Sequence, residues 1–249
     1  MYYIIILFLF FEIFVLEKGY RIGSVIHNNP KDKEIFQENF HSLIHYIISC
    51  VMLLTLFIRN NKCFDKYFIM KISERCNGII TFPELYDITI LFDISYYIVS
   101  LVHMYFYKKI KRKDEKIMYV HHFITLILML CSYLVEFGKV GGIIVLLTHN
   151  ICDIPLNLYI GINNLKKKIK INVVIENMVA LLSVIIFGYN RLVIYGGLNL
   201  YLYYNQYNDI LIPRVLLFVL YLFNVYWFGL MIKGIISEIV LKKDINFYS

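Results

Sequence analysis

Residues 111–165 read KRKDEKIMYVHHFITLILMLCSYLVEFGKVGGIIVLLTHNICDIPLNLYIGINNL, and this stretch decides the fold. A basic run opens it, and long apolar segments follow at approximately 118–137 and 142–160. The hydrocarbon core of a membrane, about 30 Å thick, needs roughly 20 apolar helical residues per crossing. Each segment meets that length, and the gap between them is short. The stretch therefore predicts a pair of antiparallel helices that cross a bilayer.

The composition of the whole chain extends this prediction. Hydrophobic residues make up 59% of the 249 residues and charged residues 17%, and the mean hydropathy is +0.64. An ordinary soluble domain has about 45–50% apolar and 25% charged residues. The composition therefore indicates an integral membrane protein. Its net charge of +7 then reflects cytosolic loops rather than nucleic-acid binding, because lysine and arginine gather in those loops.

Seven stretches are long and apolar enough to count as candidate spans, which predicts an all-α, polytopic membrane protein. The first has neither a basic run before it nor a small-residue cleavage site, so we expect a retained anchor rather than a removed signal. We expect an anchor and connecting segment over 1–35, a multi-spanning domain over 36–236 and a cytosolic tail over 237–249. The candidate spans are approximately 1–16, 41–58, 84–107, 118–137, 142–160, 171–198 and 211–232.

The basic residues orient these spans. Seventeen of them lie in the loops after the first, third and fifth spans and in the tail, against six in the loops on the other side. Since basic loops stay in the cytosol, we expect a cytosolic C-terminus and a lumenal N-terminus. Cys63 and Cys76 share a loop on the lumenal side, where oxidation is permitted. The sequence leaves open whether they are bridged.

Polar residues inside the spans converge on one layer near the cytosolic surface. His149, Asp153 and Asn157 are spaced i, i+4, i+8 and share a helix face. At about 1.5 Å per residue, Asp153 lies about 10 Å deep, and His121 and His122 on the preceding span lie about 5 Å deep. Because intramembrane ionisable groups usually face a bundle interior, we expect a polar cavity open to the cytosol. Other polar side chains expected near it are Asp93, Tyr97, His103, Asn150, Glu176, Asn177, Asn224 and Trp227.

Other interpretations of the polar residues remain beside this one. A lone His103 or Asn224 can simply bond across helices as packing. His41 and His45 form an HxxxH pattern that we expect at the membrane interface rather than on a metal. A di-iron lipid hydroxylase needs about eight histidines in several HxxH boxes, whereas this chain has seven and no such box. We therefore expect no metal, and no paired broken helices indicate a transporter.

The same region, Lys111 to Leu165, resembles the signature of the ceramide synthases within the TLC-domain family. In that signature an Arg-Lys-Asp approach precedes a His-His pair, then Thr, Ser-Tyr, a basic residue with Gly, and finally a His and an Asp four residues later. The resemblance covers most of 36–236, the expected TLC domain. Matching positions are Arg112, Lys113, Asp114, Met118, His121, His122, Thr125, Ser132, Tyr133, Lys139, Gly141, His149 and Asp153, with Phe36, Glu38, Tyr46, Asp93, Tyr97, Arg191 and Tyr226–Phe228 outside the region.

The resemblance implies a six-helix TLC barrel around a polar cavity and transfer of a fatty acyl group from acyl-CoA to the amine of a sphingoid base. It implies an endoplasmic reticulum membrane, contact with membrane lipids, a homodimer or heterodimer, and no cofactor beyond acyl-CoA as co-substrate. His121 or His122 would be the general base or the transient acyl acceptor. Asp153, with His149, would orient that imidazole. Asn150, Asn157, Glu176 and Tyr97 would support the cavity, and Arg112 and Lys113 would contact CoA phosphates.

The chain also departs from the family pattern. Asn150 stands where an aspartate is expected, Asn157 where a glutamate often follows, and His41 where a tryptophan is usual. An asparagine can hydrogen-bond an imidazole but cannot stabilise an imidazolium as a carboxylate does. Asn150 therefore favours the alternative of a non-catalytic TLC protein that binds, senses or carries lipid. The intact His121–His122 pair favours the enzyme.

Overall fold

The computed structural model describes residues 2–61, 82–108, 115–134, 136–166, 168–204 and 211–237. Every regular element in these ranges is a helix, which confirms the all-α prediction. The elements are α1 (Tyr2–Ile26), α2 (Pro30–Arg59), α3 (Pro83–Val102), η3 (His103–Tyr107), α4 (Glu115–Leu134), α5 (Glu136–Leu165), α6 (Val173–Phe187), η4 (Gly188–Ile194), α7 (Tyr195–Tyr204) and α8 (Leu211–Ile235).

The helix starts follow capping rules. Asn29 precedes α2 and accepts a hydrogen bond from the backbone N–H of Lys31, while Pro30 takes the first helical position, where no N–H is needed. Asn172 caps α6 in the same way, accepting from the N–H of Val174. Local sequence therefore sets where these spans begin.

In the described chain, six helical segments are long and apolar enough to cross a membrane, which confirms a polytopic membrane protein. The helix α1 is not among them, because Glu12, Glu17 and Lys18 interrupt its apolar run. The π-helices η3 and η4 continue their neighbouring α-helices, so α3–η3 and α6–η4–α7 are each one segment. The six segments are Pro30–Arg59, Pro83–Tyr107, Glu115–Leu134, Gly141–Leu165, Val173–Tyr204 and Leu211–Ile235.

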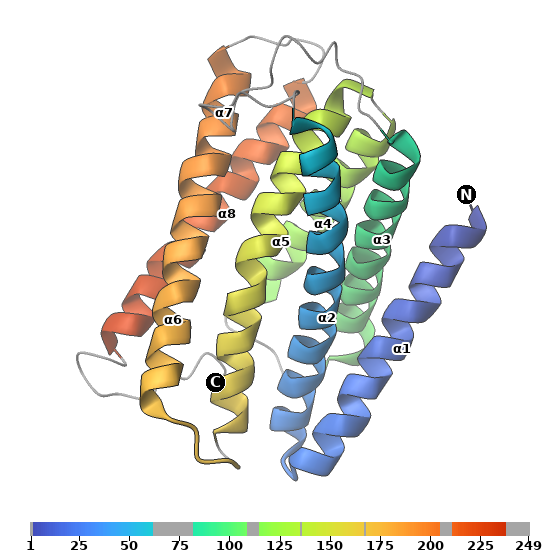
Figure 1. The fold of residues 1–249 in the computed structure, drawn as a ribbon. Helices are drawn as coiled ribbons and strands as arrows, with labels where there is room; N and C mark the ends of the chain where they lie inside the picture. Colours follow the sequence, from blue (N-terminus) through green and yellow to red (C-terminus); the bar gives the residue numbers. More distant parts are fainter. Residues whose placement is uncertain are drawn as a thin grey trace.

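These six segments form a closed ring. Around it, α2 contacts α3, α3 contacts α4, α4 contacts α8, α8 contacts α6, α6 contacts α5, and α5 returns to α2. Successive segments run in opposite directions, and α1 packs outside the ring against α2 and α3 (Figure 1). The lower end in Figure 1 therefore gathers the start of α2, α4 and α6 and the end of α3, α5 and α8.

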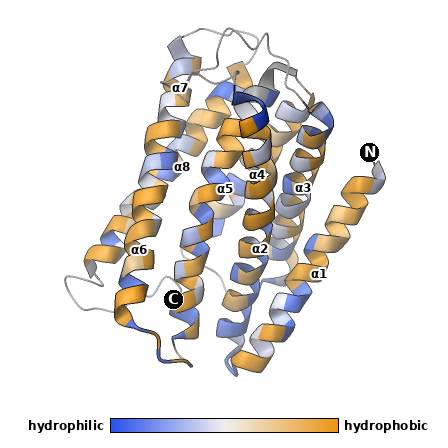
Figure 2. Ribbon diagram, in the orientation of Figure 1, coloured by the Kyte–Doolittle hydropathy of each residue, from blue (hydrophilic) through white to orange (hydrophobic). Residues whose placement is uncertain are grey.

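The apolar core and the polar groups occupy different levels of the ring. Leu53 and Leu56 at the end of α2, Ile90 of α3 and Ile143 of α5 are fully enclosed in one cluster near the upper end. Gly142 permits this approach, because a Cβ there would meet the Tyr86 hydroxyl at 2.6 Å. The lower parts of α2 and α5 are more hydrophilic (Figure 2). The core thus seals one end and leaves the polar cavity toward the other.

A proline in the fifth span, Pro155, is expected to bend the helix, because it removes one backbone donor. The proline lies inside α5, which continues as one helix from Glu136 to Leu165. Because proline donates no hydrogen bond, the carbonyl of Ile151 loses its usual partner one turn back. The neighbouring η4 also departs from α-helical geometry, and π-helical turns often mark functional sites.

Candidate active site

A cavity opens at the lower end of the ring. Residues at the mouth include Lys108 just after η3, Glu115 at the start of α4 and Ile235 at the end of α8. The cavity volume is about 210 Å³, below the roughly 300–1,000 Å³ of ordinary small-ligand pockets. A long molecule bound here would therefore extend beyond the enclosed part of the cavity.

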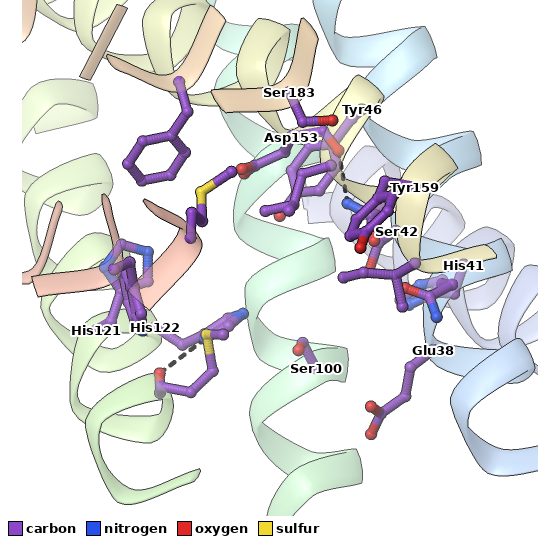
Figure 3. Close-up of a pocket in the computed structure, with 18 of the residues that line it drawn as sticks. Glu38, His41, Ser42, Tyr46, Ser100, His121, His122, Asp153, Tyr159 and Ser183 are labelled. Atoms are coloured by element: carbon purple, nitrogen blue, oxygen red, sulfur yellow. Dashed lines mark hydrogen bonds between the residues drawn. The ribbon is translucent and has the colours of Figure 1, made fainter. Parts of the chain in front are cut away.

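Two walls of different chemistry face each other across this space. On one side lie His121 and His122, and on the other His41 and Ser42 (Figure 3). Apolar side chains of α6 and α8 complete the lining. These include Ala180, Val184, Phe187, Leu230 and Met231.

The adjacent histidines both line the cavity, although successive helical residues point in different directions. Their rings are 5.7 Å apart and nearly perpendicular, at 86°. His121 lies edge-on to Trp227, with ring centroids 4.8 Å apart, and His122 contacts Tyr97 at 5.0 Å. One wall of the cavity thus carries both imidazoles.

Backbone carbonyls fix which ring nitrogen carries the proton in His122 and in His149. Nδ1 of His122 lies 2.8 Å from the carbonyl of Met118, and Nδ1 of His149 lies 2.8 Å from the carbonyl of Val145. A carbonyl can only accept, so Nδ1 carries the proton in each ring. In the neutral form Nε2 then holds the lone pair, which is the atom a general base needs.

His149 backs His121 rather than facing the cavity. Its ring stacks on that of His121 with centroids 6.4 Å apart and an interplanar angle of 24°. His149 is buried and does not line the cavity, and its Nε2 has no hydrogen-bond partner in the described part of the chain. It lies behind the cavity wall that His121 and His122 form, which we call the histidine wall.

The carboxylate of Asp153 is held by an arginine. Nη2 of Arg191 lies 2.6 Å from each oxygen of Asp153, and both side chains are buried in the cavity wall. The Tyr46 hydroxyl lies within hydrogen-bonding reach of the same carboxylate. The expected partner was an imidazole. Within the described chain, the structure instead gives Asp153 a cationic partner from η4.

Arg191 is fully engaged by its surroundings. Besides Asp153, it donates to Oδ1 of Asn224 at 3.1 Å, to Sγ of Cys152 at 2.8 Å and to the carbonyl of His149 at 3.3 Å. The sequence places Arg191 in the middle of an apolar span, where a charge usually has a specific partner. A charge within an apolar span marks Arg191 as a residue that needs a specific partner. It does not identify Asp153 on α5 as that partner.

The residues predicted to support the cavity do not all lie in it. Asn157 lines the cavity and donates to the backbone carbonyl of Asp153 at 2.8 Å. Asn150 instead donates to Oγ of Ser49 at 2.8 Å, which ties α5 to α2 away from the histidine wall. Glu176 pairs with Lys166 and does not line the cavity. Of these three, only Asn157 joins the site.

The remaining predicted residues are placed as follows. Tyr97 is a core residue whose ring supports His122 from behind. Arg112 and Lys113, the predicted phosphate contacts, lie outside the described residues, as do Cys63 and Cys76. Across the described ranges, no three His, Cys, Asp or Glu side chains are grouped to hold a metal ion.

A second buried polar cluster joins α1, α2 and α3. Glu12 contacts Nε2 of His41 at 2.7 Å and Nδ1 of His45 at 2.9 Å, and Nε2 of His45 lies 2.9 Å from Oδ1 of Asp93. Glu12, His45 and Asp93 are 0% exposed and His41 is 3% exposed. His41 and His45 are therefore buried inside the protein, where helix α1 covers them with a carboxylate.

At the mouth, Lys108 and Glu38 form another ion pair. Nζ of Lys108 lies 2.8 Å from Glu38 Oε1, and Nδ1 of His103 lies 3.8 Å from the same atom. All three side chains line the cavity. Charged groups thus gather where the cavity opens, and His103 faces it rather than serving only as packing.

Comparison with known proteins agrees with this arrangement. The TLC domain matches residues 35–233. Ceramide synthase 4 of Bos taurus is 29% identical over 174 residues, and ceramide synthase 4 of Homo sapiens is 28% identical over 174 residues. Each match covers 66% of this chain and 42% of the relative. Because the TLC match spans most of the chain, from α2 through α8, and includes the histidine pair, Asp153 and Arg191, the chain belongs to the TLC-domain family.

Proposed function

We propose that the protein is a ceramide-synthase-like N-acyltransferase, which moves a fatty acyl group from acyl-CoA to the amine of a sphingoid base. The observation that carries the proposal is the pair His121 and His122 on the wall of a partly apolar cavity that Asp153 also lines. The similarity to ceramide synthase 4 supports the same reaction class.

The histidine pair supplies the chemistry that acyl transfer needs. A sphingoid amine arrives protonated at neutral pH and must lose its proton before its lone pair attacks the thioester carbonyl carbon. The carbon–sulfur bond then breaks, and the thiolate of CoA takes a proton. An imidazole can move these protons or accept the acyl group as an acyl-imidazole. His122 suits the first role, because its Nδ1 hydrogen bond leaves the lone pair on Nε2.

Asp153 and His149 act as positioning residues in this proposal. Asp153 and Arg191 neutralise each other and join α5 to η4, while Asn224 extends the connection to α8. His149 lies against the ring of His121. These contacts hold the cavity wall in place, so a change here should act through the position of the histidines.

The substrates also fit the distribution of charge. In this proposal the CoA phosphates stay at the mouth, Arg112 and Lys113 are their proposed contacts, and the two lipid chains enter the apolar part of the cavity. The proposed mouth faces the cytosol from an endoplasmic reticulum membrane, with the N-terminus in the lumen. Pairing with a second copy or a related chain belongs to the same proposal.

The decisive experiment supplies purified protein with labelled acyl-CoA and a sphingoid base and measures ceramide by mass spectrometry. We expect ceramide from the parent and a loss of about 10²–10⁴-fold in His121→Gln or His122→Gln, the usual contribution of an acid–base group. Asp153→Ala should also lower the rate. Equal product from the parent and all three variants would contradict the assigned roles.

The same assay distinguishes the alternative function. A non-catalytic TLC protein would retain labelled acyl-CoA or sphingoid base without forming ceramide. Asn150, which favoured that alternative in the sequence, contacts Ser49 instead of a histidine. Binding without turnover by the parent protein would nevertheless establish a lipid carrier or sensor and exclude the transferase.

A further inference from the structure

A second imidazole, His41, faces the histidine pair across the cavity. It lines the wall opposite His121 and His122 (Figure 3). Its Nε2 lies 2.7 Å from the carboxylate of Glu12. A carboxylate that holds one ring nitrogen fixes the tautomer and orientation of the imidazole, the arrangement that prepares histidine for proton transfer. The cavity therefore has acid–base groups on both walls.

Glu12 comes from α1, outside the matched TLC domain at 35–233. It is fully buried between α2 and α3, where an uncompensated carboxylate would cost several kcal/mol. Both of its oxygens are used, one by His41 and one by His45. The helix α1 thus contributes a specific charged group to the body of the protein, which an anchor alone does not require.

His45 lies between the two carboxylates of the cluster. Its Nδ1 is 2.9 Å from Glu12 and its Nε2 is 2.9 Å from Oδ1 of Asp93. Glu12 therefore lies between two imidazoles, with His41 on one oxygen and His45 on the other.

The surroundings of His41 include groups of both signs. Glu12 faces it from α1, and the Tyr96 ring of α3 lies 5.0 Å from its own. Neighbouring charged or titratable groups are Glu38 and His45 on α2, His103 on η3 and Lys108 beyond it, and Lys108 is paired with Glu38. The contact with Glu12 is the shortest of those given for the His41 ring, and the cavity leads from His41 to the mouth.

We propose that His41, oriented by Glu12, accepts the first proton from the ammonium group of the substrate, and that α1 is therefore part of the catalytic body. The inference rests on the proposed function. Two protons leave the nitrogen during amide formation. The first passes to His41 and then to water at the mouth. The second leaves the nitrogen after it attacks the thioester carbon, and it passes through the histidine pair to the thiolate as the carbon–sulfur bond breaks.

The experiment compares a nucleophile that needs deprotonation with one that does not. Full-length protein is given acyl-CoA with either a sphingoid base or hydroxylamine, which is largely unprotonated at neutral pH. Ceramide and fatty hydroxamate are measured by mass spectrometry, and the hydroxamate formed without protein is subtracted. We expect His41→Gln to lower ceramide formation by about 10²-fold or more while hydroxamate formation changes less than threefold (~0.6 kcal/mol). Glu12→Gln should cause a smaller loss of the same kind, because its amide oxygen still accepts from Nε2.

A matched control comes from the same helix. Glu17 lies on α1, is exposed and pairs with Arg21, so Glu17→Gln should leave both reactions unchanged. Equal losses with both nucleophiles in the His41 and Glu12 variants would show a purely structural cluster and overturn the proposal. Unchanged ceramide formation would overturn it as well.

The solvent isotope effect on the wild-type rates tests the proposal without relying on the folding of a variant. Its rate with the sphingoid base should slow more in D₂O than its rate with hydroxylamine, and equal slowing would contradict proton transfer to His41. Failure of the proposed function is distinguishable, because the wild type would then form no ceramide and no hydroxamate beyond that from the uncatalysed reaction of hydroxylamine with acyl-CoA, and both proposals would fall.

Discussion

The ion pair between Asp153 and Arg191 offers the sharpest test of how the cavity wall is held. The perturbation is Arg191→Met, which keeps much of the side-chain volume and removes the charge. It leaves the buried carboxylate of Asp153 without its cation and Asn224 without its donor. Since breaking one side of a buried pair costs about 3–5 kcal/mol, we expect the free energy of unfolding to fall by that amount.

Removing both charges should cost much less. In Asp153→Leu combined with Arg191→Met, no uncompensated charge is left, and such replacements are often neutral. The amide of Asn224 still loses its partner, a loss of about 1–3 kcal/mol. Since each single change leaves one buried charge unpaired, at about 3–5 kcal/mol, we expect a coupling energy of at least about 3 kcal/mol, at or above the upper end of the range for contacting residues.

The assay can use the single tryptophan of the chain. Trp227 lines the cavity 4.8 Å from the ring of His121, so its fluorescence reports on the wall itself. Unfolding in mixed micelles with increasing denaturing detergent would give the free energies for parent, single and double variants. The exposed pair Glu17–Arg21 is the control, because Arg21→Met should change stability little. Additive single effects, or single losses below about 1 kcal/mol, would refute the reasoning.

Two further predictions concern packing between helices. Asn150→Asp should lower the free energy of unfolding by about 1–3 kcal/mol without raising activity, because aspartate cannot donate to Ser49 and its charge would be buried. The micelle unfolding assay and the ceramide assay check this prediction, and a gain in turnover would contradict it. Gly142→Ala should cost about 1–3 kcal/mol, because a Cβ there would collide with Oγ of Ser132. Gly161→Ala, which meets nothing within 4 Å, is its control and should be neutral or stabilising.

The sequence predicted the site best where polar residues repeat along one helix. His121, His122, Asp153 and Asn157 all line the cavity, because each faces inward from an otherwise apolar span, where lipid contact would be costly. Asn150 was grouped with them but does not line the cavity. It lies seven residues, about 10 Å, farther along α5 from the mouth than Asn157, where its amide donates to Ser49 of α2.

The sequence failed where a partner lies far along the chain. Glu12 and Arg191 were each visible as charges within apolar segments, but their partners depend on how helices rotate against one another. His41 and His45 looked interfacial because they lie near the start of an expected span. The helix α2 in fact begins at Pro30, and α1 covers both histidines, so they lie inside the protein.

The helical membrane architecture could be predicted from the sequence alone, because hydrophobic length is a local property of the chain, and the family could be predicted from the motif around His121 and His122. Only the tertiary structure decided which charges pair across helices. It placed Arg191 on Asp153, Asn150 on Ser49 and Glu12 on two histidines. The physical reason is that a buried charge is satisfied by whichever partner the packing brings within about 3 Å, and local sequence does not encode that distance.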